Sequence, residues 1–352
     1  MEQALELARG GIGKVSPNPC VGSVIVKNGN VISTGFHAKY GGPHAEVVAI
    51  DGVDCKVADL YVTLEPCCHF GKTPPCTDLI IRSGIARVFC GMNDPFSKVD
   101  GGGVKALLDA GIETFVVDDK GVRKFYQPYI KGVLFGLPYV TLKAGLSLDG
   151  KIALKNGESK WITSSLARED ARTERGLCDA VIVGSGTVLA DNCTLSSPSG
   201  SSLLRVIIDR RLSLDPHFNV FRDSHVFVAT TKMANNTRLN IFNDAGVDYN
   251  FFGDGSVDLV LLLKRLFERG VRNIFVEGGS KVHAHFLEAL FRGEKVVDKI
   301  LFYYAPVFLG EDGIGVADFS GPSKLADAIR FSEVQSSIIG GDVKTEVFLE
   351  LL

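Results

Sequence analysis

The fold of this chain is decided by two short stretches, GPHAE at residues 42–46 and LEPCCHFGKTPPC at residues 64–76. The side chains of His44, Cys67 and Cys76 offer one imidazole nitrogen and two sulfurs, a donor set that suits tetrahedral zinc. Three protein ligands leave one coordination position open, which is typical of catalytic rather than structural zinc sites. We therefore predict a catalytic zinc site formed by these three residues.

Glu46 lies two residues after the predicted histidine ligand. At this spacing its carboxylate is close to the metal without being needed as a ligand, so it suits proton transfer to and from an attacking water. A His-x-Glu sequence followed by Pro-Cys and a second cysteine resembles the pattern of zinc deaminases. Either fragment alone is commonplace, because buried cysteines often act only as small apolar side chains. The combination predicts the site.

Length and composition describe an ordinary globular protein with two domains. The 352 residues are enough for two separate cores, and 45% hydrophobic with 22% charged residues is a normal balance. The net charge of -3 gives no support for a nucleic-acid partner held by a basic surface. No apolar run is long enough to span a bilayer, and the acidic start at residues 1–6 lacks signal-peptide features.

Eight cysteines in a chain of this length indicate metal binding plus core thiols in a reducing compartment. We expect a cytoplasmic protein, or one of an organelle stroma if a transit peptide has been removed. We expect neither a nucleic-acid partner nor a membrane.

The first 137 residues predict a layered α/β/α domain built on a five-stranded sheet. Both motifs follow strand-like or loop segments and precede helix-like ones, so we expect the ligands at helix N-termini, where partial positive charge favours thiolates. The Asn28-Gly29 pair predicts a hairpin between the first two strands. Expected strands cover residues 21–26, 31–36, 60–64, 88–91 and 112–116, and expected helices residues 4–8, 104–110, the segment after His44 and the segment that ends near Arg82.

This half resembles the cytidine-deaminase-like superfamily, and within it the deaminase half of the bifunctional riboflavin-biosynthesis enzyme. Eight residues separate Cys67 from Cys76, whereas deaminases of cytidine, deoxycytidylate or tRNA usually have Cys-x-x-Cys. The segments that carry the resemblance are PNP at 17–19, VG at 21–22, GFH at 35–37, HAE at 44–46, TLEPC at 63–67, His69 and GKTPPC at 71–76.

The resemblance implies zinc as the cofactor and a phosphorylated pyrimidine as the substrate. The substrate contacts that it implies are Asn18, His37, His69, Lys72 and Thr73. Without the resemblance, turn and strand-end chemistry explains Asn18 and His37 better than binding does.

The pattern restarts around residues 135–138, so we predict a second domain over residues 138–352. Strands and helices alternate in it, which is typical of an α/β fold. A polar segment at residues 196–202 reads as a flexible insert rather than a linker. Expected strands cover residues 139–143, 180–183, 205–209, 225–229, 273–276, 299–304 and 346–351, and expected helices residues 164–175, 257–268 and a segment from Ser280 onward.

The chemistry of this second half is less evident from its residues. The EGGS sequence at 277–280 lies between a predicted strand and helix, where backbone N–H groups could hold a phosphate. It is not the Rossmann glycine pattern, and on its own a plain strand-to-helix turn is the more common explanation. Trp161, the single tryptophan, fits core packing as well as it fits a ring against a nicotinamide.

The second half is similar to the reductase half of the same enzyme, which implies a dihydrofolate-reductase-like α/β fold and NADPH as cofactor. The likeness rests on KAGLSLDGKIA at 143–153, GES at 157–159, WIT at 161–163, Arg175, residues 184–187, Asp191 and EGG at 277–279. The implied cofactor contacts are Gly145, Trp161, Thr187, Asp191, a residue near Thr231, Gly279, Ser280, Lys281, Val282, His283, Ala284 and His285. The implied substrate contacts are Ser159, Arg175, Leu195 and Glu277.

One stretch departs from that family. Residues 191–198 read DNCTLSSP, where the family usually has Asp-Asp-Pro, then Leu, then an Arg that helps to hold the substrate phosphate. Pro198 takes the place of that arginine, and losing a guanidinium removes a bidentate charge-assisted pair. Arg175 and Arg205 are the candidates to replace it.

We predict a bifunctional enzyme that deaminates a phosphorylated pyrimidine and then reduces its ribosyl group to ribityl with NADPH. The resemblance also implies a homodimer formed through the second domain. One alternative is a monofunctional deaminase whose degenerate second domain is structural. Another is a nucleic-acid deaminase or binding module, which the wide cysteine spacing and the acidic charge balance disfavour.

Overall fold

The computed structural model describes residues 1–70, 74–196, 203–331 and 333–349. The chain divides into two compact units, Met1–Gly136 and Leu137–Leu352. The predicted substrate contacts Lys72 and Thr73, the substituted position Pro198 and most of the polar insert at 196–202 lie outside the described residues.

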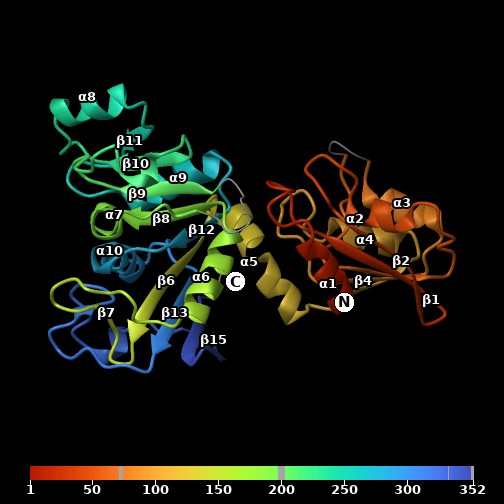
Figure 1. The fold of residues 1–352 in the computed structure, drawn as a ribbon. Helices are drawn as coiled ribbons and strands as arrows, with labels where there is room; N and C mark the ends of the chain where they lie inside the picture. The colour runs from red at the N-terminus through yellow and green to blue at the C-terminus, as the bar shows by residue number, and fades with distance from the viewer. Residues whose placement is uncertain (71–73, 197–202, 332, 350–352) are drawn as a thin grey trace. The chain divides into compact units, whose positions relative to one another are not determined.

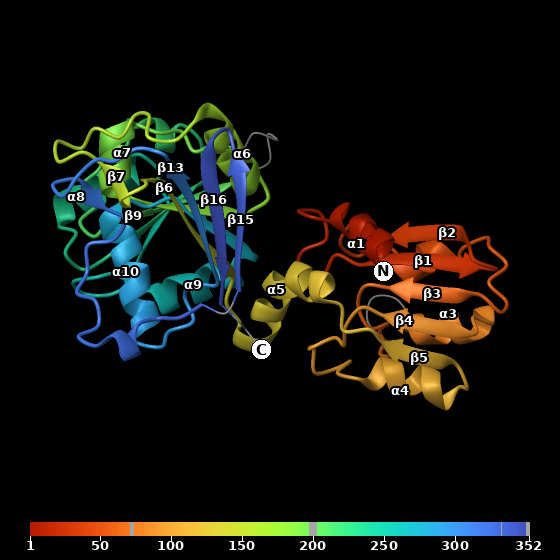
Figure 2. The same cartoon turned by 90° about the horizontal axis from the view of Figure 1, so that it is seen from below.

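The first unit contains one five-stranded sheet with strand order β2-β1-β3-β4-β5, which can be followed in Figure 2. The pairs β1–β2 and β1–β3 are antiparallel, and β3–β4 and β4–β5 are parallel. The elements are α1 (Glu2–Arg9), β1 (Gly22–Lys27), β2 (Asn30–Phe36), α2 (Ala45–Ile50), β3 (Asp59–Val62), α3 (Cys76–Ser83), β4 (Arg87–Cys90), α4 (Gly102–Asp109), β5 (Glu113–Val116) and α5 (Lys120–Phe135).

Two glycines allow helices to lie directly on opposite faces of this sheet. A Cβ atom on Gly22 would lie 1.9 Å from the Ala4 carbonyl oxygen of α1, and one on Gly35 would lie 2.3 Å from the Ala45 carbonyl oxygen of α2. Gly35 pairs with Ser23, the neighbour of Gly22, so the two glycines face opposite sides of the sheet. The predicted α/β/α layering follows, and α2 is set firmly against β2.

The hairpin between β1 and β2 forms where the sequence predicts it, with positive φ at Asn28 and Gly29. The long helix α5 was not predicted, because Pro128 in its interior argues against a helix. The ends of α5 nevertheless carry ordinary signals. Asp119 accepts a hydrogen bond from the Val122 N–H at 3.0 Å, and Gly136 ends the helix in the left-handed conformation.

The second unit is built on a nine-stranded sheet with order β11-β10-β9-β8-β12-β6-β13-β16-β15. Its first seven strands are parallel, and β16 and β15 continue it antiparallel. The elements are β6 (Tyr139–Ser147), β7 (Lys151–Ala153), α6 (Ser165–Gly176), β8 (Ala180–Gly184), α7 (Ser185–Asp191), β9 (Leu204–Ile208), η1 (Asn219–Phe221), β10 (Val226–Thr230), α8 (Asn236–Asp244), β11 (Tyr249–Phe251), α9 (Leu259–Glu268), β12 (Asn273–Val276), α10 (Ser280–Phe291), β13 (Lys299–Ala305), β14 (Ile314–Gly315), η2 (Leu325–Asp327), β15 (Glu333–Ile339) and β16 (Asp342–Phe348).

Helices α6 and α10 lie on opposite faces of this sheet (Figures 1 and 2). Below α6, Ala167 and Ala171 pack in one buried cluster with Phe275, Leu301 and Tyr303 from the strands. The helices of the described residues lack the length and apolarity that a membrane crossing needs.

Two elements differ from the sequence-based expectation at the C-terminal end. The strand predicted at residues 346–351 is β16, which begins at Asp342 and ends at Phe348. Its span is set by antiparallel pairing with β13, from Lys299 opposite Phe348 to Tyr304 opposite Val343. The strand β15, which pairs only with β16, was not predicted, because its polar, exposed sequence lacks the pattern of a half-buried strand.

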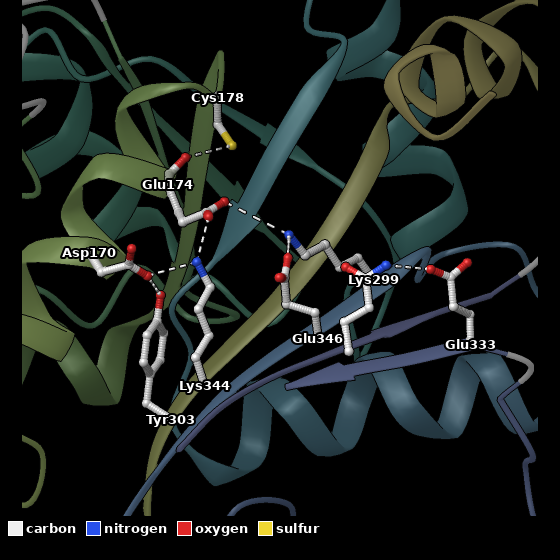
Figure 3. Close-up of polar contacts among 9 residues, drawn as sticks. Asp170, Glu174, Cys178, Lys299, Tyr303, Glu333, Lys344 and Glu346 are labelled. Carbon is white, nitrogen blue, oxygen red and sulfur yellow. Dashed lines mark hydrogen bonds and ion pairs between the residues drawn. The ribbon is translucent and has the colours of Figure 1, made fainter. Parts of the chain in front are cut away.

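A network of charged side chains joins α6 to the antiparallel end of the sheet (Figure 3). The Lys344 ammonium lies 2.8 Å from a carboxylate oxygen of Asp170 and 2.8 Å from one of Glu174, which are one turn apart on α6. Lys299 is 2.6 Å from Glu346. Lys344 is largely buried and is the nearer of two cations to Glu174, whose other oxygen lies 3.8 Å from the Lys299 ammonium.

We predict that Lys344→Met destabilises the second unit by about 3–5 kcal/mol, because two partly buried carboxylates lose their shared cation. Urea unfolding measures the effect. The matched control is Lys232→Met, which removes an ammonium from a fully exposed pair with Asp254 and should leave the transition in place. Equal midpoints for the two variants would contradict the prediction.

Candidate functional site

The three predicted zinc ligands come together at one end of α2 and α3. His44 is the residue immediately before α2, Cys76 is the first residue of α3, and Cys67 lies in the loop after β3. The Nδ1 atom of His44 lies 3.3 Å from the Cys76 Sγ and 3.5 Å from the Cys67 Sγ. The three ligand atoms lie within 4.8 Å of one another, although His44 and Cys76 are 32 residues apart.

The geometry of this cluster fits a tetrahedral zinc ion. Metal bonds of about 2.1 Å to nitrogen and 2.3 Å to sulfur place ligand atoms roughly 3.6–3.8 Å apart in a tetrahedron. The two measured separations from the imidazole nitrogen, 3.3 and 3.5 Å, are close to that spacing. Small movements of the side chains suffice to hold the ion.

Cys67 does not begin a helix, contrary to the expectation that both motifs open helices. It precedes the start of α3 by nine residues, yet the loop returns it to that point, and the Cys76 backbone N–H donates to the Cys67 Sγ at 3.3 Å. Hydrogen bonds from Cys76 and His44 lower the pKa of Cys67, so Cys67 is the one of the two thiols that ionises first. Cys67 therefore favours the thiolate form that a metal requires.

Glu46 lies in the first turn of α2, and only 3% of it is exposed. Burial raises the pKa of Glu46 to about 7. A carboxyl group with a pKa near neutrality both accepts and donates protons easily, as a group that acts first as base and then as acid must do.

His37 and Asn18 lie beside the zinc ligands. The His37 Nδ1 is 2.8 Å from the Pro43 carbonyl oxygen, its Nε2 is 3.3 Å from the Asn18 amide nitrogen, and its ring lies edge-on to His44 at 5.4 Å. His69 lies near Phe96, and its buried Nδ1 has no hydrogen-bond partner among the described residues. Asn18 and His37 are thus near the cluster, His69 lies in the Cys67 loop beside Phe96, and the other two predicted contacts, Lys72 and Thr73, lie outside the described residues.

In the second unit, Arg175 and Glu277 form a largely buried ion pair. Arg175 is in the last turn of α6, and Glu277 follows β12 directly. The Arg175 guanidinium lies 3.1 Å from one carboxylate oxygen of Glu277, and it donates to the Ser196 carbonyl oxygen at 2.8 Å. This pair lies at the carboxyl ends of the parallel strands, where open α/β sheets bind ligands.

The start of α10 fits the phosphate group of a nucleotide cofactor. No side chain caps this helix, and the buried Ser280 hydroxyl has no partner in the described part of the chain. A Cβ atom on Gly278 would lie 2.5 Å from the Val282 Cβ, and one on Gly184 would lie 2.7 Å from a Val282 methyl carbon. Only glycines allow this close approach, so no side chain covers the start of α10, where the positive end of the helix attracts an anion.

Other predicted cofactor contacts are spread over the same edge of the sheet. Gly145 lies on β6, Thr187 and Asp191 lie on α7, and Lys281, Ala284 and His285 lie in the first turns of α10. The Asp191 carboxylate is 3.1 Å from the Lys160 ammonium. His283 is almost fully buried, and its Nε2 atom has no hydrogen-bond partner among the described residues. Burial lowers the pKa of His283 to about 4.

The remaining predicted cofactor and substrate contacts of the second unit differ in how far they are buried. Trp161 is 67% exposed under the Arg168 guanidinium, so it is not a core residue. Ser159 lies in the turn before it. The Leu195 side chain packs in the hydrophobic cluster between α7 and β9, and Thr231 is buried and donates to the Arg210 carbonyl oxygen at 2.8 Å.

Both halves of the chain match known protein families. Residues 1–92 match the cytidine and deoxycytidylate deaminase zinc-binding region, and residues 138–345 match the RibD C-terminal domain. Over 98% of its length the chain is 38% identical to the riboflavin biosynthesis protein RibD of Bacillus amyloliquefaciens, covering 94% of that protein. The chain belongs to the RibD family. The RibD of Escherichia coli is 35% identical over 97% of this chain and 96% of its own length.

Solved RibD structures share the whole architecture. The diaminohydroxyphosphoribosylaminopyrimidine deaminase/5-amino-6-(5-phosphoribosylamino)uracil reductase of Thermotoga maritima is 38% identical, with a TM-score of 0.83 over 99% of this chain and 97% of that one. RibD of Acinetobacter baumannii is 34% identical with a TM-score of 0.83 and the same coverage. In the RibD family a zinc-dependent deaminase half precedes an NADPH-dependent reductase half, and both halves are present here.

The segment that departs from the RibD pattern has a structural explanation at one position. Asn192 ends α7 in the left-handed conformation, which asparagine tolerates, and its side chain accepts from the Asn219 N–H at 2.8 Å. Of the two arginines that could replace the missing one, Arg205 is already paired with Asp223, whose carboxylate neutralises it. Arg175 is therefore the better candidate.

Sequence reasoning gave Glu65 no role, although it belongs to the RibD cysteine motif. Only 4% of it is exposed, and its carboxylate accepts hydrogen bonds from the backbone N–H groups of Asp94, Gly101 and Val104. The signal that could have indicated this role is a charged residue in an otherwise apolar strand end, TLEPC, with a glycine triplet, residues 101–103, further along the chain.

We predict that Cys76→Ser abolishes stoichiometric zinc binding, because a serine hydroxyl is a far weaker zinc ligand than a thiolate. Metal analysis of the purified protein measures the zinc content. Cys55→Ser is the matched control, since Cys55 is a buried cysteine of the same unit outside the cluster. Full zinc content in the Cys76 variant would show that the cluster is not the metal site.

Proposed function

We propose that residues 1–137 of this RibD-family enzyme deaminate a diaminohydroxyphosphoribosylaminopyrimidine, and that residues 138–352 reduce the resulting 5-amino-6-(5-phosphoribosylamino)uracil with NADPH. The observation that carries the proposal is the cluster of His44, Cys67 and Cys76 beside the buried carboxyl of Glu46. Likeness to the Thermotoga maritima enzyme over 99% of the chain supports the substrate assignment.

In the deaminase half, zinc held by the three ligands supplies a Lewis acid that makes a water nucleophilic near neutral pH. Glu46 would take a proton from that water and pass it to the ring nitrogen. It would then take the proton of the newly added hydroxyl and deliver it to the amino group, which leaves as ammonia. The Asn18–His37 pair beside the ligands offers hydrogen bonds that orient the pyrimidine. His69, with its open Nδ1, is a further polar contact for the substrate.

In the reductase half, NADPH supplies the hydride when it is bound. The first turn of α10, with the free Ser280 hydroxyl, binds a cofactor phosphate. Arg175 binds the substrate phosphate in place of the missing arginine, and Glu277 holds the Arg175 guanidinium in position.

The monofunctional alternative requires a degenerate second half, and the observations disfavour it. The RibD C-terminal model matches residues 138–345 without interruption. The second half also contains the Arg175–Glu277 ion pair and the two glycines that pack against Val282 at the start of α10. Purified protein separates the two cases: ammonia release reports the first activity, and NADPH oxidation that follows deamination reports the second.

We predict that Glu46→Gln keeps zinc bound and lowers ammonia release by at least about 100-fold, because the amide cannot transfer protons. The assay is ammonia release by the zinc-loaded variant, with metal analysis on the same sample. NADPH oxidation with the deaminated substrate should be unchanged. Near-normal ammonia release would remove Glu46 from the mechanism.

We predict that Arg175→Gln lowers reductase kcat/KM by about 10- to 100-fold, the loss expected for about 1.5–3 kcal/mol of charge-assisted hydrogen bonding. NADPH oxidation is the assay, and ammonia release is the internal reference. Arg172→Gln, an exposed position on the same helix, is the control. Equal reductase kcat/KM for the Arg175→Gln and Arg172→Gln variants would show that Arg175 does not bind the substrate phosphate.

The proposal includes a homodimer formed through residues 138–352. Strand β15 is the last strand in the described sheet order, and Val334 and Ile338 on it are 61% and 70% exposed. An edge strand with exposed apolar side chains is suited to pair with a second copy. Sedimentation velocity should show a dimer for the native chain and a monomer for the double variant Val334→Lys with Ile338→Lys. A native monomer would refute this part of the proposal.

A further inference from the structure

The loop that carries Cys67 is held from the side opposite α3 by a single buried carboxylate. The Glu65 side chain accepts from the Asp94 N–H at 3.1 Å and the Gly101 N–H at 3.0 Å through one oxygen, and from the Val104 N–H at 2.9 Å through the other. Its own N–H donates to the Met92 carbonyl oxygen at 3.1 Å. Glu65 is therefore tied by three hydrogen bonds to the segment between β4 and α4 and by a fourth to the first turn of α4.

These contacts lie at the N-terminal end of α4, where no side chain provides a cap. Two of the three donors, Gly101 and Val104, belong to that end, so the carboxylate satisfies N–H groups that the helix leaves open. A negative charge at a helix N-terminus is favourable, and burial strengthens the interaction.

The two segments approach so closely that only glycine fits at one position. A Cβ atom on Gly103 would lie 2.0 Å from the Pro66 carbonyl oxygen and 3.1 Å from Glu65 Oε1. A Cβ atom on Gly102 would lie 3.0 Å from the Cys68 Sγ. The segment at residues 101–103 therefore lies against the Pro66 carbonyl on one side of Cys67 and the Cys68 side chain on the other.

We infer that Glu65 is a positioning residue, which fixes the Cys67 sulfur for metal binding by anchoring its loop to the start of α4. The opposite side of the loop is held by α3, where the N–H groups of Cys76 and Thr77 donate to the Cys67 sulfur and carbonyl oxygen. With both sides fixed, the Cys67 thiolate is held near the His44 imidazole before the metal arrives. This inference rests on the zinc site of the proposed function.

Two variants disturb the contact between Glu65 and the start of α4, one by changing Glu65 and the other by changing Gly103. Glu65→Gln keeps the length of the side chain but turns an amide N–H toward a backbone donor, so at least one of the three N–H groups loses its acceptor. Gly103→Ala keeps the carboxylate and forces the two backbones apart. The matched controls are Glu113→Gln at an exposed position of β5 and Gly321→Ala, where a Cβ atom meets nothing within 4 Å.

The test uses the full-length, metal-loaded chain and measures zinc release to a chromogenic chelator. We expect release about 10- to 100-fold faster for both variants than for the native chain and the controls, as for other residues that orient metal ligands. With cobalt in place of zinc, the visible absorption bands should shift, because they report ligand geometry. Reductase activity should stay at the native level, which shows that the second unit is folded, and the unfolding temperature of the metal-free form reports whether the first unit is folded.

Unchanged zinc release and unchanged cobalt bands in the Glu65→Gln variant would overturn the inference. A variant that releases zinc at the native rate but whose metal-free form unfolds at a lower temperature would also overturn the inference. The contact would then serve stability alone. Should a variant not fold, amide hydrogen exchange of the native chain decides: zinc loading that leaves exchange at Gly101 and Val104 unchanged overturns the inference, and slower exchange supports it. A native chain that binds no zinc would instead refute the proposed function.

Discussion

The deaminase half of this protein depends on one constraint: two sulfurs and an imidazole from distant parts of the chain must meet beside a buried carboxyl group. The N-terminal ends of two helices position most of these groups. His44 and Cys76 stand at the beginnings of α2 and α3, and the N–H groups of α3 reach the Cys67 loop. Because bringing thiolates and a carboxyl group together in a partly buried site is unfavourable, the rest of the unit has to hold the cluster in place.

Close backbone contacts provide that support. Gly35 lets α2 rest on β2, and Gly103 lets α4 approach the cysteine loop, so both ends of the cluster are fixed by packing that tolerates no side chain. A second set of buried hydrogen bonds joins α5 to the same sheet. The Thr63 hydroxyl and the Tyr126 hydroxyl lie 2.7 Å apart, and the Tyr126 hydroxyl donates to the Cys20 carbonyl oxygen.

The reductase half uses charge in a similar way. Arg175 is held by Glu277, and the next residue toward the N-terminus, Glu174, is held by Lys344 from β16. A helix anchored by buried ion pairs at successive residues presents its last arginine in a fixed position. This fixed position is what our proposal requires of Arg175 if it is to take the place of the missing family arginine.

The sequence by itself determined the family resemblance, the alternation of strands and helices, and the three candidate zinc ligands that the structure brings together, because these depend on residue type and short spacing. It could not reveal α5, whose interior Pro128 contradicts local helix preference, or β15, whose polar sequence forms a strand only by pairing with β16. Only the tertiary structure decided that Glu65 belongs to the metal site and that Arg205 is occupied by Asp223. Both facts depend on contacts between residues far apart in the chain, which no local pattern contains.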